Sequence, residues 1–176
     1  ILSATQQVDS GHSRLAIAGG AESYSRVPHA VTTLRGGVKR GPATLEDMLD
    51  WAYRCPFSLE YMGETAENLA EDYGLSRAAM DDWGVLSQER ALAAQASGFL
   101  ARQIMGVAVP DPKAGKGATR IFDTDECVRA DATPEKLARL RPAFHEGGRV
   151  TAGNASTVND AAAFVLVGDR AMLESK

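Results

Sequence analysis

One segment of the sequence concentrates the groups that could bind a ligand. Residues 151–160 read TAGNASTVND and combine small side chains and hydroxyls with the amides of Asn154 and Asn159, directly before an apolar run. Small side chains let a ligand approach the backbone, and N–H groups and hydroxyls can bind an amide or a phosphate. The same composition is typical of a turn stabilised by asparagine. The segment is therefore either a ligand-binding loop or a structural turn, and composition favours neither.

Residues suited to acid–base or nucleophilic chemistry are scattered along the chain. The sequence has no GxSxG, HExxH, complete GxGxxG or P-loop motif. Its histidines, His12, His29 and His145, lie near glycine or proline, which is typical of exposed loops. Cys55 and Cys127 have neither CxxC spacing nor a neighbouring histidine, so we expect structural thiols and no disulfide or metal site. The residues alone point to no catalytic centre.

The composition is that of an ordinary globular protein. The 176 residues are 44% hydrophobic and 24% charged, enough for one domain with or without an insertion. The net charge of −4 argues against a nucleic-acid partner, and the short basic cluster of Arg35, Lys39 and Arg40 is typical of an exposed loop. No apolar run reaches the ~18 to 20 residues of a membrane helix, and no secretory signal is visible. We therefore expect a cytoplasmic protein with no membrane partner, and a natural sequence that begins before the helical residues at Ile1.

The elements that would position residues 151–160 begin and end in an α/β pattern. Residues 1–10 are predicted to end a helix, which Gly11 stops. An apolar strand over residues 14–18 is predicted to be buried and to run into a tight loop at the glycine pair that follows it. Residues 161–167 are apolar at nearly every position, as in a strand buried on both faces. This order of elements is typical of an α/β fold.

The middle of the chain is predicted to be mainly helical. Apolar residues recur at helical spacing over residues 62–73, and Gly74 ends that helix. Ser76 caps a longer helix that ends at Gly98. The predicted buried stripe of the longer helix comprises Met80, Trp83, Ser87, Ala91 and Ala94. The first helix carries acidic residues that we expect on a solvated face, namely Glu64, Glu67 and Glu71.

Shorter elements are predicted around these helices. Residues 27–44, rich in glycine, proline and basic side chains, predict a long loop of the kind that is often functional or interfacial. A strand over residues 103–109 is expected to turn and pair with residues 119–122. Thr133, followed by proline, is the expected N-cap of another helix, and residues 169–175 are expected to begin the last one.

Four segments of the sequence resemble the thiolase family and occur in the thiolase order. They are AGGAESYS at 18–25, MGETAENLA at 62–70, RLRPAF at 139–144 and VTAGNAS at 150–156, the last followed by NDAAA at 159–163. The corresponding family patterns are AGGxESMS, MGxTAEN, KLKPAF and VTAGNAS. Each is weak alone, but four in order with compatible spacings argue strongly against chance.

The resemblance implies the thiolase fold, a layered α/β arrangement of two similar halves with a mostly helical loop domain inserted in the first half. On this expectation residues 1–28 and 150–176 belong to the N-terminal half, and residues 29–149 form the loop domain. Residues 27–44 fall where thiolases carry a tetramerisation loop. We therefore expect a homo-oligomer, a dimer of dimers.

The resemblance also implies covalent acyl transfer with coenzyme A thioesters as substrates and no cofactor. In thiolases a cysteine attacks the acyl-CoA and holds the acyl group as a thioester, a histidine activates that cysteine, and a second cysteine moves a proton on acetyl-CoA. The motifs that carry these residues (CxSGxxA, NEAF, GHP and CxGGG) are absent from this sequence, and Cys55 and Cys127 match none of them. We therefore expect an internal piece of an acetyl-CoA acyltransferase that has no catalytic residue of its own and is inactive by itself.

What the resemblance assigns to this sequence is the surface that binds coenzyme A. Met62 is expected to line the inner end of the pantetheine tunnel, and Arg129 to lie near the adenine or phosphates. Ser156 is expected to hydrogen-bond the pantetheine arm, with Ala152 and Val158 alongside. Two of these assignments have a structural alternative: Met62 could be part of the helix core, and Arg129 could be an ordinary surface arginine.

Two positions depart from the family pattern, and other functions stay open. Tyr61 stands where many biosynthetic members have histidine, and Thr157 where glycine is usual, so the family average does not give the acyl-chain preference. One alternative is a thiolase-like protein that binds acyl-CoA or lipid without turning it over. Another is a non-enzymatic helical module whose role is assembly. A nucleotide-dependent oxidoreductase is a poor match, because the fingerprint glycines after the first pair are missing.

Overall fold

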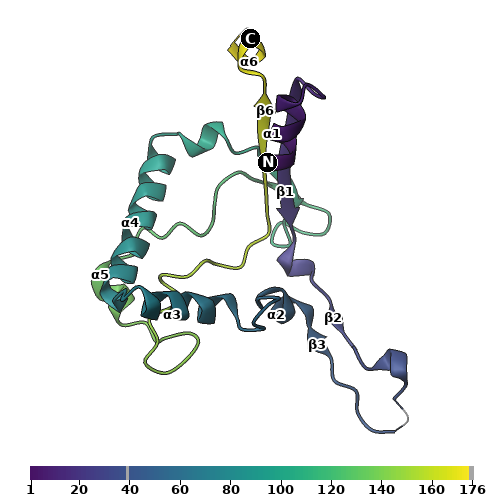
Figure 1. Ribbon diagram of the computed structural model, residues 1–176, viewed down its shortest axis with the longest axis vertical. Helices are drawn as coiled ribbons and strands as arrows, with labels where there is room; N and C mark the ends of the chain where they lie inside the picture. Colours follow the sequence, from purple (N-terminus) through teal and green to yellow (C-terminus); the bar gives the residue numbers. More distant parts are fainter. Residues whose placement is uncertain (39, 175–176) are drawn as a thin grey trace. The chain divides into compact units, whose positions relative to one another are not determined.

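The computed structural model describes residues 1–38 and 40–174 (Figure 1). Contacts divide the chain into two compact units, one comprising residues 1–53 and the segment from Val158 onward, the other Arg54–Thr157. The chain enters and leaves the second unit once, so that unit is an insertion in the first. The family-based boundaries at residues 28 and 150 stay a prediction.

The first unit is built on an antiparallel pair of strands. β1 (Leu15–Glu22) pairs with β6 (Ala161–Gly168), with Leu15 opposite Gly168 and Glu22 opposite Ala161. Helix α1 (Leu2–Asp9) contacts both strands, and α6 (Arg170–Glu174) follows β6. The predicted helix stop is confirmed, because Gly11 has the left-handed φ of 74° that ends a helix. Ser175, in the predicted last helix, lies outside the described residues.

The loop predicted at Gly19 and Gly20 is wrong, since both lie inside β1. Pairing with β6 keeps the backbone extended there, and Gly19 faces Phe164 across the ladder. A Cβ at Gly19 would overlap the Phe164 ring and the Ala163 carbonyl oxygen, whereas a Cβ at Gly20 would meet open space. The first glycine therefore makes room for an aromatic ring, and no turn is needed.

The predicted burial of the two strands is also wrong within this chain. Ile17 is 75% exposed, and Phe164 and Leu166 are 63% and 55% exposed. Only two strands pair in this sheet among the described residues, and a single ribbon cannot cover both of its own faces. The apolar runs are those of buried strands, but the layers that would bury them are not among the described residues.

A long excursion separates β1 from the second unit. It contains the 3₁₀ turns η1 (Tyr24–Arg26) and η2 (Leu34–Gly36) and is closed by β2 (His29–Ala30) pairing with β3 (Glu46–Asp47). Helix α2 (Met48–Ala52) then begins at Asp47, whose carboxylate accepts the Leu49 N–H. Most of the predicted loop at 27–44 is irregular, and Arg35 and Arg40 are exposed as expected. Lys39 lies outside the described residues.

The second unit confirms the predicted helices. α3 (Met62–Asp72) and α4 (Arg77–Ala96) are followed by glycines with left-handed φ, Gly74 and Gly98. The Ser76 hydroxyl accepts the Ala79 N–H, and Thr133 caps α5 (Pro134–Ala138) in the same way. The predicted strand pair is β4 (Val107–Pro110) with β5 (Thr119–Phe122), after the 3₁₀ turn η3 (Leu100–Arg102). Figure 1 shows α5 beside the amino-terminal part of α4.

Two predictions about helix faces are wrong. Trp83 on the predicted buried stripe of α4 is 67% exposed, and the face turned inward carries Asp81 and Val85 instead. Glu67 is not on a solvated face of α3 but is 4% exposed, in contrast to the exposed Glu71. The buried carboxylates are tolerated because hydrogen-bond donors reach them, backbone N–H groups of Arg149 and Val150 for Glu67 and the side chains of Arg77 and Asn154 for Asp81.

The core of the second unit is small and lies where α3, α4 and α5 meet residues 148–154. Its most buried members are Glu67, Ala70, Asp81, Val85, Leu137, Val150 and Thr151. Among the described residues, no helix has the length and apolar character needed to cross a membrane.

The close approach at Gly19 generates a prediction about stability. Replacing Gly19 with Ala should lower the free energy of unfolding by about 1–3 kcal/mol, because the added methyl overlaps Phe164 and a backbone oxygen. Gly20→Ala is the matched control and should change it by less than about 0.5 kcal/mol, since nothing lies near its Cβ position. Urea denaturation of both variants measures this, and equal effects would contradict the packing at Gly19.

Candidate functional site

The segment singled out from the sequence begins with a turn that is fixed by a buried glutamate. The Glu67 carboxylate of α3 accepts the backbone N–H of Arg149 at 2.7 and 2.9 Å and that of Val150 at 2.6 Å. Gly148 passes so close that a Cβ there would lie 2.5 Å from the Glu67 Oε1. The chain therefore enters residues 151–156 along a path that α3 sets.

Asn154 fixes the turn itself. Its Oδ1 accepts the Thr151 N–H at 2.8 Å, and its Nδ2 donates to the Arg149 carbonyl at 3.0 Å and to Asp81 Oδ1 at 2.9 Å. The other carboxylate oxygen of Asp81 accepts from Arg77 Nε at 2.8 Å. Asp81 is 3% exposed, so α4 presents a buried acceptor to the turn.

Glycines bring α4, α5 and the turn into close packing. A Cβ at Gly84 of α4 would lie 2.9 Å from the Gly153 carbonyl oxygen. A Cβ at Gly153 would lie 2.7 Å from side-chain carbons of both Leu137 and Leu140. Arg77 Nη2 also donates to the carbonyls of Leu137 and Leu140, at 2.7 and 3.0 Å, and so ties the end of α5 to α4. The turn is thus rigidly seated on three helices.

The segment divides into a structural part and an exposed part. Thr151 is fully buried and Asn154 is half-buried, which matches the interpretation of an asparagine-stabilised turn. Ala152, Ser156 and Val158 are exposed. Within the described part of the chain, the Ser156 hydroxyl makes one long bond of 3.4 Å, to the neighbouring Thr157 carbonyl, so it can exchange that bond for one to a ligand.

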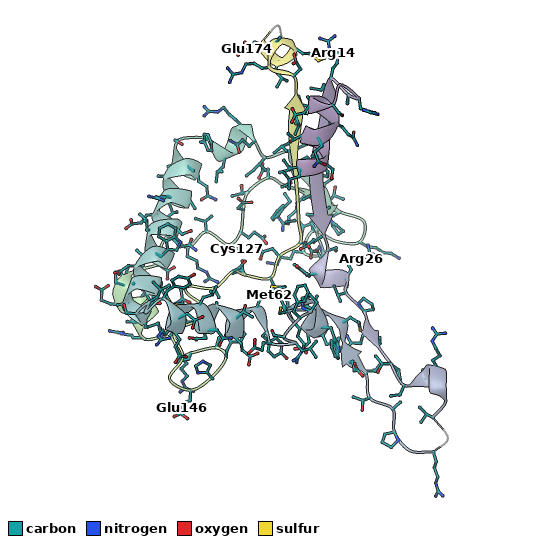
Figure 2. The ribbon with its side chains drawn as sticks, in the orientation of Figure 1. Arg14, Arg26, Met62, Cys127, Glu146 and Glu174 are labelled. Carbon is teal, nitrogen blue, oxygen red and sulfur yellow. The ribbon has the colours of Figure 1, made fainter. Side chains whose placement is uncertain are left out.

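The structure brings some of the predicted binding residues together and leaves others on separate elements. Ala152 and Ser156 flank the same turn of the second unit. Met62 is the first residue of α3 and is 54% exposed, so it is not helix core (Figure 2). Arg129 is exposed, and its backbone N–H donates to Gln88 Oε1 of α4 at 2.8 Å. Val158 opens the return segment of the first unit.

The residue before Met62 is held by a cation. The Arg54 guanidinium lies over the Tyr61 ring, 4.1 Å from its centroid, and also donates to the Tyr61 hydroxyl. Glu64 accepts the Tyr61 N–H at 2.7 Å and so completes the start of α3. Met62 therefore projects from a well-fixed helix terminus.

One cysteine differs from the inert thiol expected from the sequence. Both Cys55 and Cys127 are half-buried. The backbone N–H of Ser58, helped by that of Phe57 and by the Ser58 hydroxyl, holds the pKa of the Cys55 thiol below its usual range. The tight turn after Cys55 causes this, because it aims these donors at the sulfur. The groups that lower this pKa are all hydrogen-bond donors of the turn, and none of them is a histidine.

Several polar residues of this site were missed from the sequence, namely Glu67, Arg77, Asp81 and Gln88. They lie at helical spacing on the inward faces of α3 and α4. The available signal was Gly84, because a glycine inside a long helix costs about 1 kcal/mol and indicates close packing of another segment. No group of His, Cys, Asp and Glu side chains within residues 1–38 and 40–174 is arranged to hold a metal ion.

Asp160 marks where the segment rejoins the first unit. Its carboxylate accepts the Ser25 N–H at 2.8 Å and the Ser23 hydroxyl at 3.3 Å, and it is also bonded by the Ser25 hydroxyl. The Ser25 donors hold the pKa of Asp160 below its usual range. This exposed carboxylate therefore joins the start of β6 to the chain after β1.

Comparison with protein families matches almost the whole chain to one family model. The model described as the thiolase N-terminal domain covers residues 1–171. Among curated relatives, beta-ketothiolase BktB of Cupriavidus necator is 45% identical over an alignment of 177 positions, which covers 100% of this chain and 44% of the relative. A probable acetyl-CoA acetyltransferase of Escherichia coli is 43% identical over 93% of this chain and 41% of the relative. The chain thus spans less than half the length of these relatives.

Solved structures agree with the sequence comparison. The acetyl-CoA acetyltransferase of Bacillus anthracis matches with a TM-score of 0.86 and 37% identity, over 98% of this chain and 43% of that structure. Human mitochondrial 3-ketoacyl-CoA thiolase in complex with CoA matches with a TM-score of 0.81 and 33% identity, over 97% of this chain and 41% of that one. The α/β fold expected from the four motifs is confirmed.

The hydrogen bonds to Asp160 generate a prediction about pH. Because its folded-state pKa is depressed, the carboxylate contributes stability above its unfolded pKa of about 3.9 and loses it as pH falls through the folded value. The difference in unfolding free energy between the protein and Asp160→Asn should therefore be largest above about pH 5 and shrink below about pH 4. Denaturation at a series of pH values measures it. In a Ser25→Ala background this difference should depend less on pH, because one donor to Asp160 is lost. If the difference between the parent and Asp160→Asn does not change with pH, the hydrogen bonds do not lower the pKa of Asp160.

Proposed function

The chain belongs to the thiolase family, and from this premise we propose that it is part of an enzyme that transfers an acyl group between a cysteine thioester and acetyl-CoA. The reaction forms acetoacetyl-CoA or a longer 3-ketoacyl-CoA, or cleaves it with free CoA. The observation that carries the proposal is the family match over residues 1–171 together with the names of the relatives, which are ketothiolases and acetyl-CoA acyltransferases. The contribution of this chain is coenzyme A binding.

The exposed parts of the second unit suit the chemistry of coenzyme A. Its pantetheine arm carries amides, which the exposed Ser156 hydroxyl can hydrogen-bond beside the small side chain of Ala152. The exposed apolar Met62 suits the methylene part of the arm. The assignment of Val158 to the binding surface stays a prediction from the family resemblance. The exposed Arg129 offers a cation for the phosphates. Coenzyme A thioesters are substrates here, and the proposal involves no other cofactor.

The covalent chemistry belongs to residues outside this chain. A cysteine thiolate attacks the thioester carbonyl of the acyl-CoA, the C–S bond to CoA breaks, and the acyl group is held on the enzyme. A second cysteine takes a proton from the methyl group of acetyl-CoA, and the carbanion attacks the carbonyl carbon of the acyl-enzyme. The new carbon–carbon bond forms while the C–S bond to the enzyme breaks, which releases the first cysteine as a thiolate. Neither Cys55 nor Cys127 lies in a motif for these steps, so this chain positions the substrate and supplies no nucleophile.

Assembly and location complete the proposal. The excursion over residues 27–44, in which Leu34 is 58% exposed, and the 64% exposed Leu45 that follows it offer apolar contacts that suit a tetramer built as a dimer of dimers. The proposed loop domain over residues 29–149 then carries most of this excursion together with the CoA-facing helices. The enzyme is proposed to work in the cytoplasm.

The first test is activity of the full-length protein with both cysteines of this chain replaced. The Cys55→Ala and Cys127→Ala double variant should retain most of the thiolytic cleavage of acetoacetyl-CoA by CoA, measured as the loss of absorbance of the Mg²⁺–enolate complex. Iodoacetamide should abolish that activity with one modified cysteine per active site. A protein that binds CoA but neither cleaves nor forms acetoacetyl-CoA would instead be a non-catalytic acyl-CoA binder or an assembly module.

The second test concerns the binding surface. Ser156→Trp should raise the Kd for CoA at least about tenfold, because the indole replaces an exposed hydroxyl on a rigid turn and fills the space beside it. Isothermal titration with CoA measures this, and circular dichroism checks that the fold is retained. Ser87→Trp, at an exposed position of α4, is the matched control and should leave the affinity unchanged. Unchanged affinity of Ser156→Trp would remove Ser156 from the site.

A further inference from the structure

We infer that Glu67 and Asp81 are positioning residues for coenzyme A binding: the two buried carboxylates set the backbone of residues 149–154 and thereby the exposed Ser156 that follows. The inference rests on the proposed function, because it is at the CoA-binding surface that the position of Ser156 has a consequence. Neither carboxylate is expected to touch the substrate. They act through the turn.

Glu67 links two elements of the proposed binding surface. It lies on α3, the helix that begins at Met62, and its carboxylate binds the backbone N–H groups of Arg149 and Val150. All three contacts are between 2.6 and 2.9 Å, as expected for a charged acceptor. The start of the turn therefore cannot shift relative to α3 without leaving a buried carboxylate unsatisfied, which is costly.

Asp81 holds the other end of the turn. One oxygen accepts from Asn154 Nδ2 at 2.9 Å and the other from Arg77 Nε at 2.8 Å. Asn154 is two residues before Ser156, and its own Oδ1 binds the Thr151 N–H at 2.8 Å. The side chain of Asn154 is thus oriented at both ends, so the direction in which the chain leaves the turn toward Ser156 is fixed.

The same helix also holds a second CoA-facing segment. Gln88 lies on α4 two turns beyond Asp81, and its Oε1 accepts the Arg129 N–H at 2.8 Å. The polar side chains of α4 therefore hold two of the proposed CoA contacts, Gln88 through the backbone of Arg129 and Asp81 through the side chain of Asn154 near Ser156.

The test compares isosteric variants with exposed neighbours in the full-length protein. Glu67→Gln and Asp81→Asn each replace an acceptor oxygen with an amino group that faces a donor, so the turn loses a bond. Each should raise KM for acetoacetyl-CoA roughly tenfold with kcat within about twofold of the parent. The matched controls, Glu71→Gln on α3 and Asp82→Asn on α4, are exposed and should leave both constants unchanged.

A purely structural role gives a different result. The apparent kcat would then fall in proportion to the folded fraction, which calorimetry measures, and KM would stay at the parent value. That outcome overturns the inference. If Asp81→Asn does not fold, Asn154→Ala tests the same link, because it removes the hold of the turn on Asp81 while keeping the Arg77–Asp81 ion pair. If Glu67→Gln does not fold, Gly148→Ala tests the other link, because the added methyl would meet the Glu67 carboxylate. The same rise in KM is expected, and its absence overturns the inference.

The proposed function and the inference fail separately. Ser156→Trp is measured alongside the carboxylate variants. A raised KM in Ser156→Trp with parental KM in Glu67→Gln and Asp81→Asn overturns the inference alone. A parental KM in Ser156→Trp overturns the proposed binding surface, and the inference falls with it.

Discussion

The organisation of the second unit depends on two buried carboxylates, those of Glu67 and Asp81. An acidic group at 3–4% exposure is tolerated only when hydrogen-bond donors surround it, and the chain supplies them from residues far away in the sequence. Glu67 is satisfied by backbone N–H groups about 80 residues later, and Asp81 by Arg77 and Asn154. Because neither carboxylate can be left without its partners, the helices and the turn form one cooperative arrangement.

Glycines make that arrangement sterically possible. Gly84 lets the turn approach the middle of α4, and Gly153 lets it approach the leucines of α5. A comparable relation occurs in the first unit, where Gly19 accommodates the Phe164 ring across the strand pair. At all three positions the glycine provides space, while its conformational freedom matters elsewhere, at the helix ends.

The turn separates structural from binding functions within a few residues. Thr151 and Asn154 point inward and complete the core, whereas Ala152 and Ser156 stay exposed beside them. Such a division is what a ligand-binding loop needs, since a group that must be placed within a fraction of an ångström is best carried on a rigid support. The proposed recognition of coenzyme A uses this rigidity, and the acyl-transfer chemistry is left to residues beyond this chain.

Local sequence determined the helices and their ends, because those depend on neighbouring residues. Ser76 and Thr133 cap, Gly11, Gly74 and Gly98 adopt left-handed φ, and the predicted boundaries are within a few residues of the observed ones. The ordered motifs also determined the family and, through it, the α/β fold. The sequence did not show which residues face inward, since Glu67 is buried where its pattern predicts a solvated face and Trp83 is exposed where its pattern predicts a buried stripe. Only the tertiary structure decided this. Long-range contacts determine whether a buried carboxylate finds hydrogen-bond donors and whether an apolar strand is covered, and the neighbouring residues in the sequence do not.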